Sequence, residues 1–222
     1  MADRPLFYYI TDRTQFGVDD KDRRRRLLDK IREAAACGVD YIQLREKDLP
    51  ARDLEELARQ AVAAIREASQ NAPAPVCRLL INSRADIALA VGADGIHLRS
   101  DDVSIADQKA LRDRSPLQQR ATWHISVSCH SEQEVKRAAT HRANFVVFGP
   151  VFQKGNATGS GLEALRRVSR HAIPVLALGG VTVENAPACM AAGASGIAGI
   201  RLFQQNNIAD VVRQIKERVA SE

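Results

Sequence analysis

Long apolar runs and paired cysteines are both missing from this chain of 222 residues. No stretch approaches the roughly 20 consecutive apolar residues that cross a bilayer, so we expect no membrane partner. The apolar run near the N-terminus, residues 6–10, is too short for a signal peptide. The cysteines lack a Cys-x-x-Cys pair and metal-ligand spacing, which favours reduced thiols in a cytoplasmic protein. They are Cys37, Cys77, Cys129 and Cys189.

A strong excess of one charge sign is absent as well. The chain has 32 Lys and Arg residues against 27 Asp and Glu residues, a formal net charge of +5. This balance permits anionic ligands such as phosphates, and we expect no nucleic-acid partner. Hydrophobic residues make up 45% and charged residues 27%, a composition that excludes wholesale disorder. The length fits one domain that spans residues 1–222.

Four segments share one pattern: an alanine-rich stretch, a turn at Gly or Arg142, a short polar residue and an apolar run. The pattern predicts a helix that ends in the left-handed conformation and leads into a buried strand. The polar residues stand 50 to 54 positions apart, which indicates a repeated architecture. They are Asp40, Asp94, Asn144 and Ser195.

Further apolar runs lie between these segments, so each interval has room for two strand–helix units. The runs are residues 6–10, 78–81, 122–127 and 174–178. Apolar stripes at helical spacing occur within residues 27–35, 54–65 and 208–219. The count is eight strands, each followed by a helix, although the third and sixth helices are short and weakly marked. We therefore predict a (β/α)₈ TIM barrel. A doubly wound open sheet is the alternative, but no G-x-G-x-x-G follows the first strand.

The predicted barrel directs attention to the residues that follow its strands, because active sites of this fold lie there. After the second strand, Gln43, Arg45 and Lys47 alternate and so point to one side of an extended segment. Three donors on one side could bind a phosphate or diphosphate. The alternative is a strand end that is ion-paired with Glu46. We favour the ligand, since inward polar groups are costly to bury without a partner.

Small residues follow the last two strands, where this fold often binds phosphate. Gly179, Gly180 and Gly199 would let backbone N–H groups approach an anion, and Ile200 and Arg201 come next. A tight turn is the alternative explanation for the glycine pair.

Three further residues could act in catalysis or metal binding. His130 could be a general acid or base, or it could cap the next helix. His97, at a strand end, is expected to be structural. Asp102, with Asp101, could bind Mg²⁺ beside a phosphate or cap a helix.

Several motifs appear in order along the chain and together resemble a known family. They are Tyr9-Ile10-Thr11-Asp12, Gln43-Leu44-Arg45-Glu46-Lys47, Leu80-Ile81-Asn82-Ser83-Arg84-Ala85-Asp86, Val91-Gly92-Ala93-Asp94-Gly95-Ile96-His97-Leu98, Val127-Ser128-Cys129-His130-Ser131, Phe148-Gly149-Pro150-Val151-Phe152 and Leu178-Gly179-Gly180-Val181. This set resembles the thiamine phosphate synthase family, whose other branch contains the thiazole tautomerases. The resemblance covers the chain from about Leu6 to Ile200.

The resemblance implies a transferase that couples hydroxymethylpyrimidine diphosphate to a thiazole phosphate, with Mg²⁺-assisted release of diphosphate. Its partners would be these two small phosphorylated molecules, and a homo-oligomer is left open. By motif position, the diphosphate would be held by Gln43, Arg45, Lys47 and Asn82. Asp102 would bind Mg²⁺, and Ser128 would face the pyrimidine, with His130 nearby. The thiazole phosphate would lie against the glycines after the last two strands and against Ile200 and Arg201.

The sequence departs from the family pattern at the implied metal and phosphate sites. Ser83 stands where the family has its first Mg²⁺-binding aspartate, and Arg99-Ser100 stands where it has Gly-Gln. Residues 153–158, which include Lys154, replace a Thr-x-Thr-Lys loop, and Arg201 replaces a serine. Two alternatives therefore stay open: a metal-independent thiazole tautomerase that uses His130, and a binder of a thiamine-related phosphate without turnover.

Overall fold

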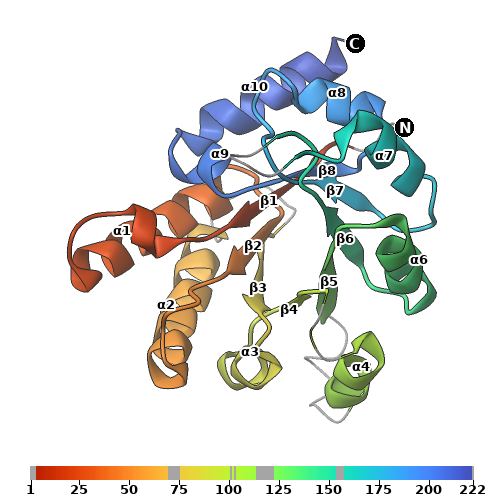
Figure 1. Cartoon of the computed structure of the whole chain (residues 1–222). Helices are drawn as coiled ribbons and strands as arrows, with labels where there is room; N and C mark the ends of the chain where they lie inside the picture. Colours follow the sequence, from red (N-terminus) through yellow and green to blue (C-terminus); the bar gives the residue numbers. More distant parts are fainter. Residues whose placement is uncertain are drawn as a thin grey trace.

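A computed structural model describes residues 4–69, 76–100, 102, 104–113, 123–153 and 158–221 of the chain. Eight parallel strands pair in chain order, and the eighth returns to the first, so they close into a barrel surrounded by helices (Figure 1). The strands are β1 Leu6–Ile10, β2 Tyr41–Leu44, β3 Arg78–Asn82, β4 Gly95–Leu98, β5 His124–Cys129, β6 Phe145–Phe148, β7 Val175–Ala177 and β8 Gly196–Gly199. The predicted (β/α)₈ fold is confirmed.

The helices lie outside the strands, and every strand is followed by at least one of them. They are η1 Arg13–Gln15, α1 Asp20–Ala36, α2 Ala51–Ser69, α3 Ala85–Val91, α4 Ile105–Asp113, α6 Glu132–Thr140, α7 Gly161–Val168, α8 Ala186–Ala191, α9 Arg201–Gln204 and α10 Ile208–Ala220. The two weakly marked helices of the sequence pattern are α3 and α7, with seven and eight residues. Within the described ranges, no helix is both long and apolar enough to cross a membrane.

At three of the four turns from helix to strand, the repeated polar residue accepts a backbone hydrogen bond through its side chain. The side chain of Asp40 accepts a hydrogen bond from Phe7 N at 2.9 Å, and that of Asp94 accepts one from Leu79 N at 2.8 Å. Asn144 Oδ1 accepts a hydrogen bond in the same way from Ile125 N, near the start of β5. Each residue therefore satisfies a donor at the start of the preceding strand. The turns before them have positive φ, as the pattern predicts.

The barrel closes where β1 lies beside β8, with Leu6 opposite Gly196 and Tyr9 opposite Gly199. A Cβ atom at Gly196 would collide with the carbonyl oxygen of Leu6, so this position requires glycine. Inside the barrel, Tyr8, Phe145 and Leu176 belong to an apolar cluster. The polar site lies where the strands finish.

Candidate active site

A chain of buried polar groups rises through the barrel interior to the strand ends. Tyr8 Oη lies 3.1 Å from His97 Nδ1, which also lies 2.8 Å from Ser126 Oγ. His97 Nε2 lies 2.8 Å from Ser128 Oγ. Gln43 is buried in β2, and its Nε2 donates to Tyr8 Oη at 3.1 Å. His97 thus connects the interior to Ser128, the residue implied to face the pyrimidine.

His97 is held neutral by this environment. Burial lowers its pKa to about 3; the charge of Asp102 opposes this to a smaller extent, and the charge of Arg45 adds to it. A neutral imidazole accepts a hydrogen bond on one nitrogen and donates one on the other. The expectation that His97 is structural did not include its contact with Ser128. The link depends on β4–β5 register, which places His97 beside Ser126 and which one sequence does not reveal.

In the segment after β2, the acidic residue and the basic residues lie on different sides of the rim. Glu46 is buried and turns toward β1, where it accepts hydrogen bonds from Thr11 Oγ1 at 2.5 Å and Arg13 N at 2.9 Å. Arg13 completes an ion pair with it at 3.4 Å. Arg45 is half-buried and Lys47 is exposed, and among the described residues neither has an ion-pair partner. The alternative of a strand end neutralised by Glu46 is therefore wrong, because Glu46 pairs with Arg13.

Thr11 fixes the position of the same segment. Its Oγ1 accepts a hydrogen bond from Arg45 N at 3.0 Å while its hydroxyl donates to Glu46. Burial raises the pKa of Glu46, although the bonds from Thr11 and Arg13 oppose this effect. The backbone that carries Arg45 is thereby fixed against β1.

At the ends of β3 and β4, Asp102 accepts several hydrogen bonds. Asn82 Nδ2 donates to Ser83 Oγ at 3.1 Å, and Ser83 Oγ donates to Asp102 Oδ2 at 2.5 Å. Arg99 donates to the same carboxylate from its backbone N at 2.7 Å and from Nε at 3.2 Å. Burial alone would raise the pKa of Asp102, but these bonds outweigh it and hold the pKa below its usual range.

This arrangement does not fit the Mg²⁺ ion that the family resemblance implies. Mg²⁺ prefers carboxylate and phosphate oxygens in octahedral geometry. Ser83 offers a neutral hydroxyl whose proton goes to Asp102, and the Asp102 carboxylate is ion-paired with Arg99. In the part of the chain that the structure describes, no group of three or more His, Cys, Asp or Glu residues is placed to hold a metal. Asp101 lies outside that part.

His130 follows β5 and is anchored to the end of β6. Its Nδ1 lies 2.6 Å from the carbonyl oxygen of Gly149. A carbonyl only accepts, so Nδ1 donates this hydrogen bond and Nε2 is the ring nitrogen left for another partner. The backbone N of His130 also donates to Glu134, four residues later in α6. These contacts account for a structural role and leave Nε2 as the nitrogen that could exchange a proton.

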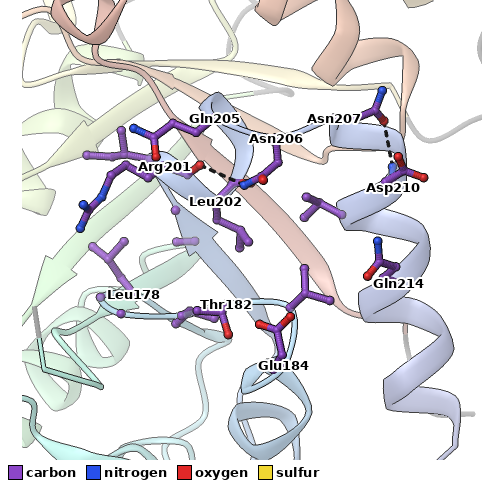
Figure 2. A pocket seen from close by; sticks show the side chains of 18 residues that line it. Leu178, Thr182, Glu184, Arg201, Leu202, Gln205, Asn206, Asn207, Asp210 and Gln214 are labelled. Atoms are coloured by element: carbon purple, nitrogen blue, oxygen red, sulfur yellow. Dashed lines mark hydrogen bonds between the residues drawn. The ribbon is translucent and has the colours of Figure 1, made fainter.

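A cavity of about 600 Å³ opens between the ends of β7 and β8 and the helices that follow (Figure 2). Gly179 and Gly180 border it with φ values of +94° and +64°, which favour glycine. A Cβ atom at Gly180 would lie 2.7 Å from Phe152 Cβ, so a side chain there meets the neighbouring loop. Gly199, Ile200 and Arg201 line the cavity from β8 and the start of α9.

Figure 2 shows polar side chains around the mouth of this cavity. Arg201 lies on the α9 side, Thr182 and Glu184 lie on the β7–α8 side, and Asp210 and Gln214 lie along α10. The structure brings together all the residues assigned from the sequence to the last two strands. Lys154, which could replace the charge of the missing family loop, lies outside the described residues.

Fold and site together define a (β/α)₈-barrel protein with a polar site at the carboxyl ends of its strands. The chain belongs to the thiamine monophosphate synthase family, whose model matches residues 7–203. A thiamine-phosphate synthase from Methanoculleus marisnigri is 34% identical over 220 residues, which cover 96% of this chain and 95% of that protein. A thiamine-phosphate synthase from Moorella thermoacetica is 35% identical over 201 residues, covering 88% and 89%.

A solved structure supports the same family. The thiamine phosphate pyrophosphorylase from Pyrococcus furiosus superposes with a TM-score of 0.77 at 27% identity, covering 99% of this chain and 98% of that one. The family resemblance seen in the sequence motifs is therefore confirmed.

Proposed function

We propose that this protein is a thiamine phosphate synthase-like transferase of thiamine biosynthesis. It would couple hydroxymethylpyrimidine diphosphate to thiazole phosphate and release diphosphate. The observation that carries this proposal is that one rim has two separate edges suited to anions. Arg45 and Lys47 follow β2 and Asn82 ends β3, whereas the glycine-bordered cavity lies at the ends of β7 and β8. A reaction that joins two phosphorylated molecules needs two such edges, whereas isomerisation of one phosphorylated molecule needs only one.

In this proposal, the chain's own residues stabilise the charge that leaves. The bond between the pyrimidine methylene carbon and the diphosphate oxygen breaks, and the electron pair leaves with the diphosphate. The thiazole nitrogen then donates its lone pair to that carbon, which gives a cationic thiazolium without loss of a proton. Arg45 and Lys47 would stabilise the departing negative charge, a main source of catalysis in group transfer. No step is assigned to a magnesium ion, because the residues around Asp102 do not fit one.

The buried polar chain would orient the reacting pyrimidine. Ser128 Oγ is held by neutral His97, which is in turn fixed by Ser126 and Tyr8. We assign Ser128 to the pyrimidine and Gln43 to support of this chain through Tyr8, with His130 Nε2 nearby as a proton-exchanging group. Gly179, Gly180, Gly199, Ile200 and Arg201 would hold the thiazole phosphate.

Steady-state kinetics of paired arginine variants would test the two-edge proposal. Arg45→Ala should raise KM for the pyrimidine diphosphate about tenfold or more, and Arg201→Ala should do the same for the thiazole phosphate only, as expected for loss of a charge-assisted hydrogen bond. Arg32→Ala removes an ion-paired arginine of α1, away from both edges, and should change neither KM. Variants that alter both KM values equally, or neither, would refute two separate edges.

A further inference from the structure

Arg99 presents a cation at the rim directly after β4, and Asp102 holds it in place. The Asp102 carboxylate accepts from both the backbone N and the Nε of Arg99, at 2.7 Å and 3.2 Å. The Arg99 side chain is 52% exposed, whereas that of Asp102 is only 12% exposed. The carboxylate therefore orients the guanidinium, and about half of the Arg99 side chain is exposed to solvent.

Ser83 completes this arrangement in a strained backbone conformation. Its φ is +58°, a value uncommon for residues other than glycine, asparagine and aspartate. The backbone N of Ser83 donates to His97 O at 2.9 Å, and its hydroxyl donates to Asp102 Oδ2. Strain of this kind persists where the surroundings fix it and is concentrated at functional sites. Here it holds a hydroxyl on the carboxylate that orients Arg99.

The Arg99–Asp102 pair lies beside the groups assigned to the pyrimidine substrate. Arg99, Asp102 and Ser128 line one cavity of about 160 Å³ between the ends of β4 and β5 and helices α4 and α6. The charges of Asp102 and Arg45 both act on the ring of His97, which contacts Ser128. The cation of Arg99 therefore lines the same cavity as Ser128, the residue assigned to the pyrimidine.

We propose that Arg99, oriented by Asp102 and Ser83, binds the diphosphate of the substrate in place of a divalent cation. This inference rests on the proposed function for the identity of the anion. A guanidinium supplies positive charge and directional donors to phosphate oxygens, which is the contribution that bond cleavage requires. The electron pair leaves with the diphosphate, and Arg99, Arg45 and Lys47 stabilise it together. The carboxylate that would bind a metal instead orients an arginine.

Calorimetric titration with inorganic diphosphate tests this assignment without any turnover. The wild-type protein should bind it with the same Kd, within about threefold, in a chelator and in millimolar Mg²⁺. Arg99→Gln should weaken binding about tenfold or more in the chelator, the loss expected for a charge-assisted hydrogen bond. Arg32→Gln makes the same charge change at a similarly exposed arginine, also paired with an aspartate three residues away, and should leave Kd unchanged. Circular dichroism would check that each variant is folded.

A second variant tests whether Arg99 takes the place of a metal ion by restoring a possible metal site. Ser83→Asp combined with Arg99→Gly places two carboxylates at the rim without the guanidinium. Electron paramagnetic resonance should then show Mn²⁺ binding that the wild-type protein lacks, and diphosphate binding should become dependent on Mg²⁺. Three results would each overturn the inference. The wild-type protein could need Mg²⁺ to bind diphosphate, or it could bind Mn²⁺ as tightly as the variant does. The Arg99→Gln protein could also bind diphosphate with an unchanged Kd.

The inference and the proposed function fail in different ways. Metal-independent binding of inorganic diphosphate through Arg99, with no coupling of the two substrates, would refute the synthase activity and keep the Arg99 site. Formation of thiamine phosphate together with diphosphate binding that requires Mg²⁺ would keep the activity and refute the assignment of Arg99.

Discussion

At the scale of single residues, His97 has the most unusual chemical environment of the site. It contacts Tyr8, Ser126 and Ser128, and burial keeps its ring neutral. The identity of Ser128 as a substrate-facing residue could be proposed from its motif. The hydrogen bond between His97 and Ser128 could not be proposed from the sequence. It joins neighbouring strands whose register is set by packing across the whole barrel.

The neutral ring of His97 makes stability depend on pH. In the unfolded chain a histidine binds a proton below about pH 6.5, whereas the folded ring stays neutral down to a pKa of about 3. The free energy of unfolding should therefore fall as the pH is lowered from 6.5 toward 3, by up to about 1.4 kcal/mol per pH unit from this group. Urea unfolding of the wild type and of His97→Gln at several pH values measures this pH dependence of the free energy of unfolding. An equal slope in both proteins contradicts a neutral His97.

Glu46 is predicted to position Arg45 through Thr11. Glu46→Gln leaves one of the buried donors, Thr11 Oγ1 or Arg13 N, with a poorer acceptor, so stability should fall by roughly 1–3 kcal/mol. The KM for the pyrimidine diphosphate should rise while kcat changes less, because the Arg45 backbone loses its support. Asp48→Asn is the matched control, since Asp48 pairs with Arg13 at an exposed position 2.6 Å away. A control that shifts KM as much as Glu46→Gln would remove the positioning role.

At the scale of elements, the repeated polar residue was visible in the sequence and its spacing predicted the helix-to-strand turns. The structure adds the reason, which is that Asp40, Asp94 and Asn144 accept backbone N–H groups at the start of the preceding strand. The pairing of Asp102 with Arg99 was not predictable in the same way. It arises within a short loop whose conformation depends on Ser83 and on β3–β4 packing.

The turn after β7 should be sensitive to a single methyl group. Gly180→Ala forces a side chain into φ +64° and toward Phe152, so the backbone at this edge of the cavity should move. We expect KM for the thiazole phosphate to rise about tenfold, the equivalent of about 1.4 kcal/mol. Gly38→Ala introduces similar backbone strain at φ +84° with open space around it and lies outside the site. A thiazole phosphate KM that responds to both variants alike would refute the phosphate assignment.

At the scale of the whole molecule, barrel closure brings the first and last strands together and creates the rim on which both anion-suited edges lie. The strand count and the repeat were sufficient to predict a closed (β/α)₈ barrel. The sequence did not indicate which side chains contact one another across neighbouring strands of the rim. Those contacts depend on the register of all eight strand pairs.

Closure is predicted to depend on Gly196. Gly196→Ala places a methyl group against the backbone of Leu6, so the free energy of unfolding should fall by about 3 kcal/mol or more. Ser195→Ala, one residue earlier, should change it by less than about 0.5 kcal/mol. Urea denaturation of both proteins measures the difference. Equal stability of the two variants would contradict the close β1–β8 approach.

The most direct test of the central claim is product formation by the purified wild-type protein. Hydroxymethylpyrimidine diphosphate and thiazole phosphate are supplied together, in a chelator and in Mg²⁺, and thiamine phosphate is followed by fluorescence after oxidation. The account predicts thiamine phosphate in both conditions, with equimolar diphosphate released. A folded protein that forms no thiamine phosphate in either condition would contradict it and direct attention to thiazole tautomerisation through His130 or to ligand binding alone.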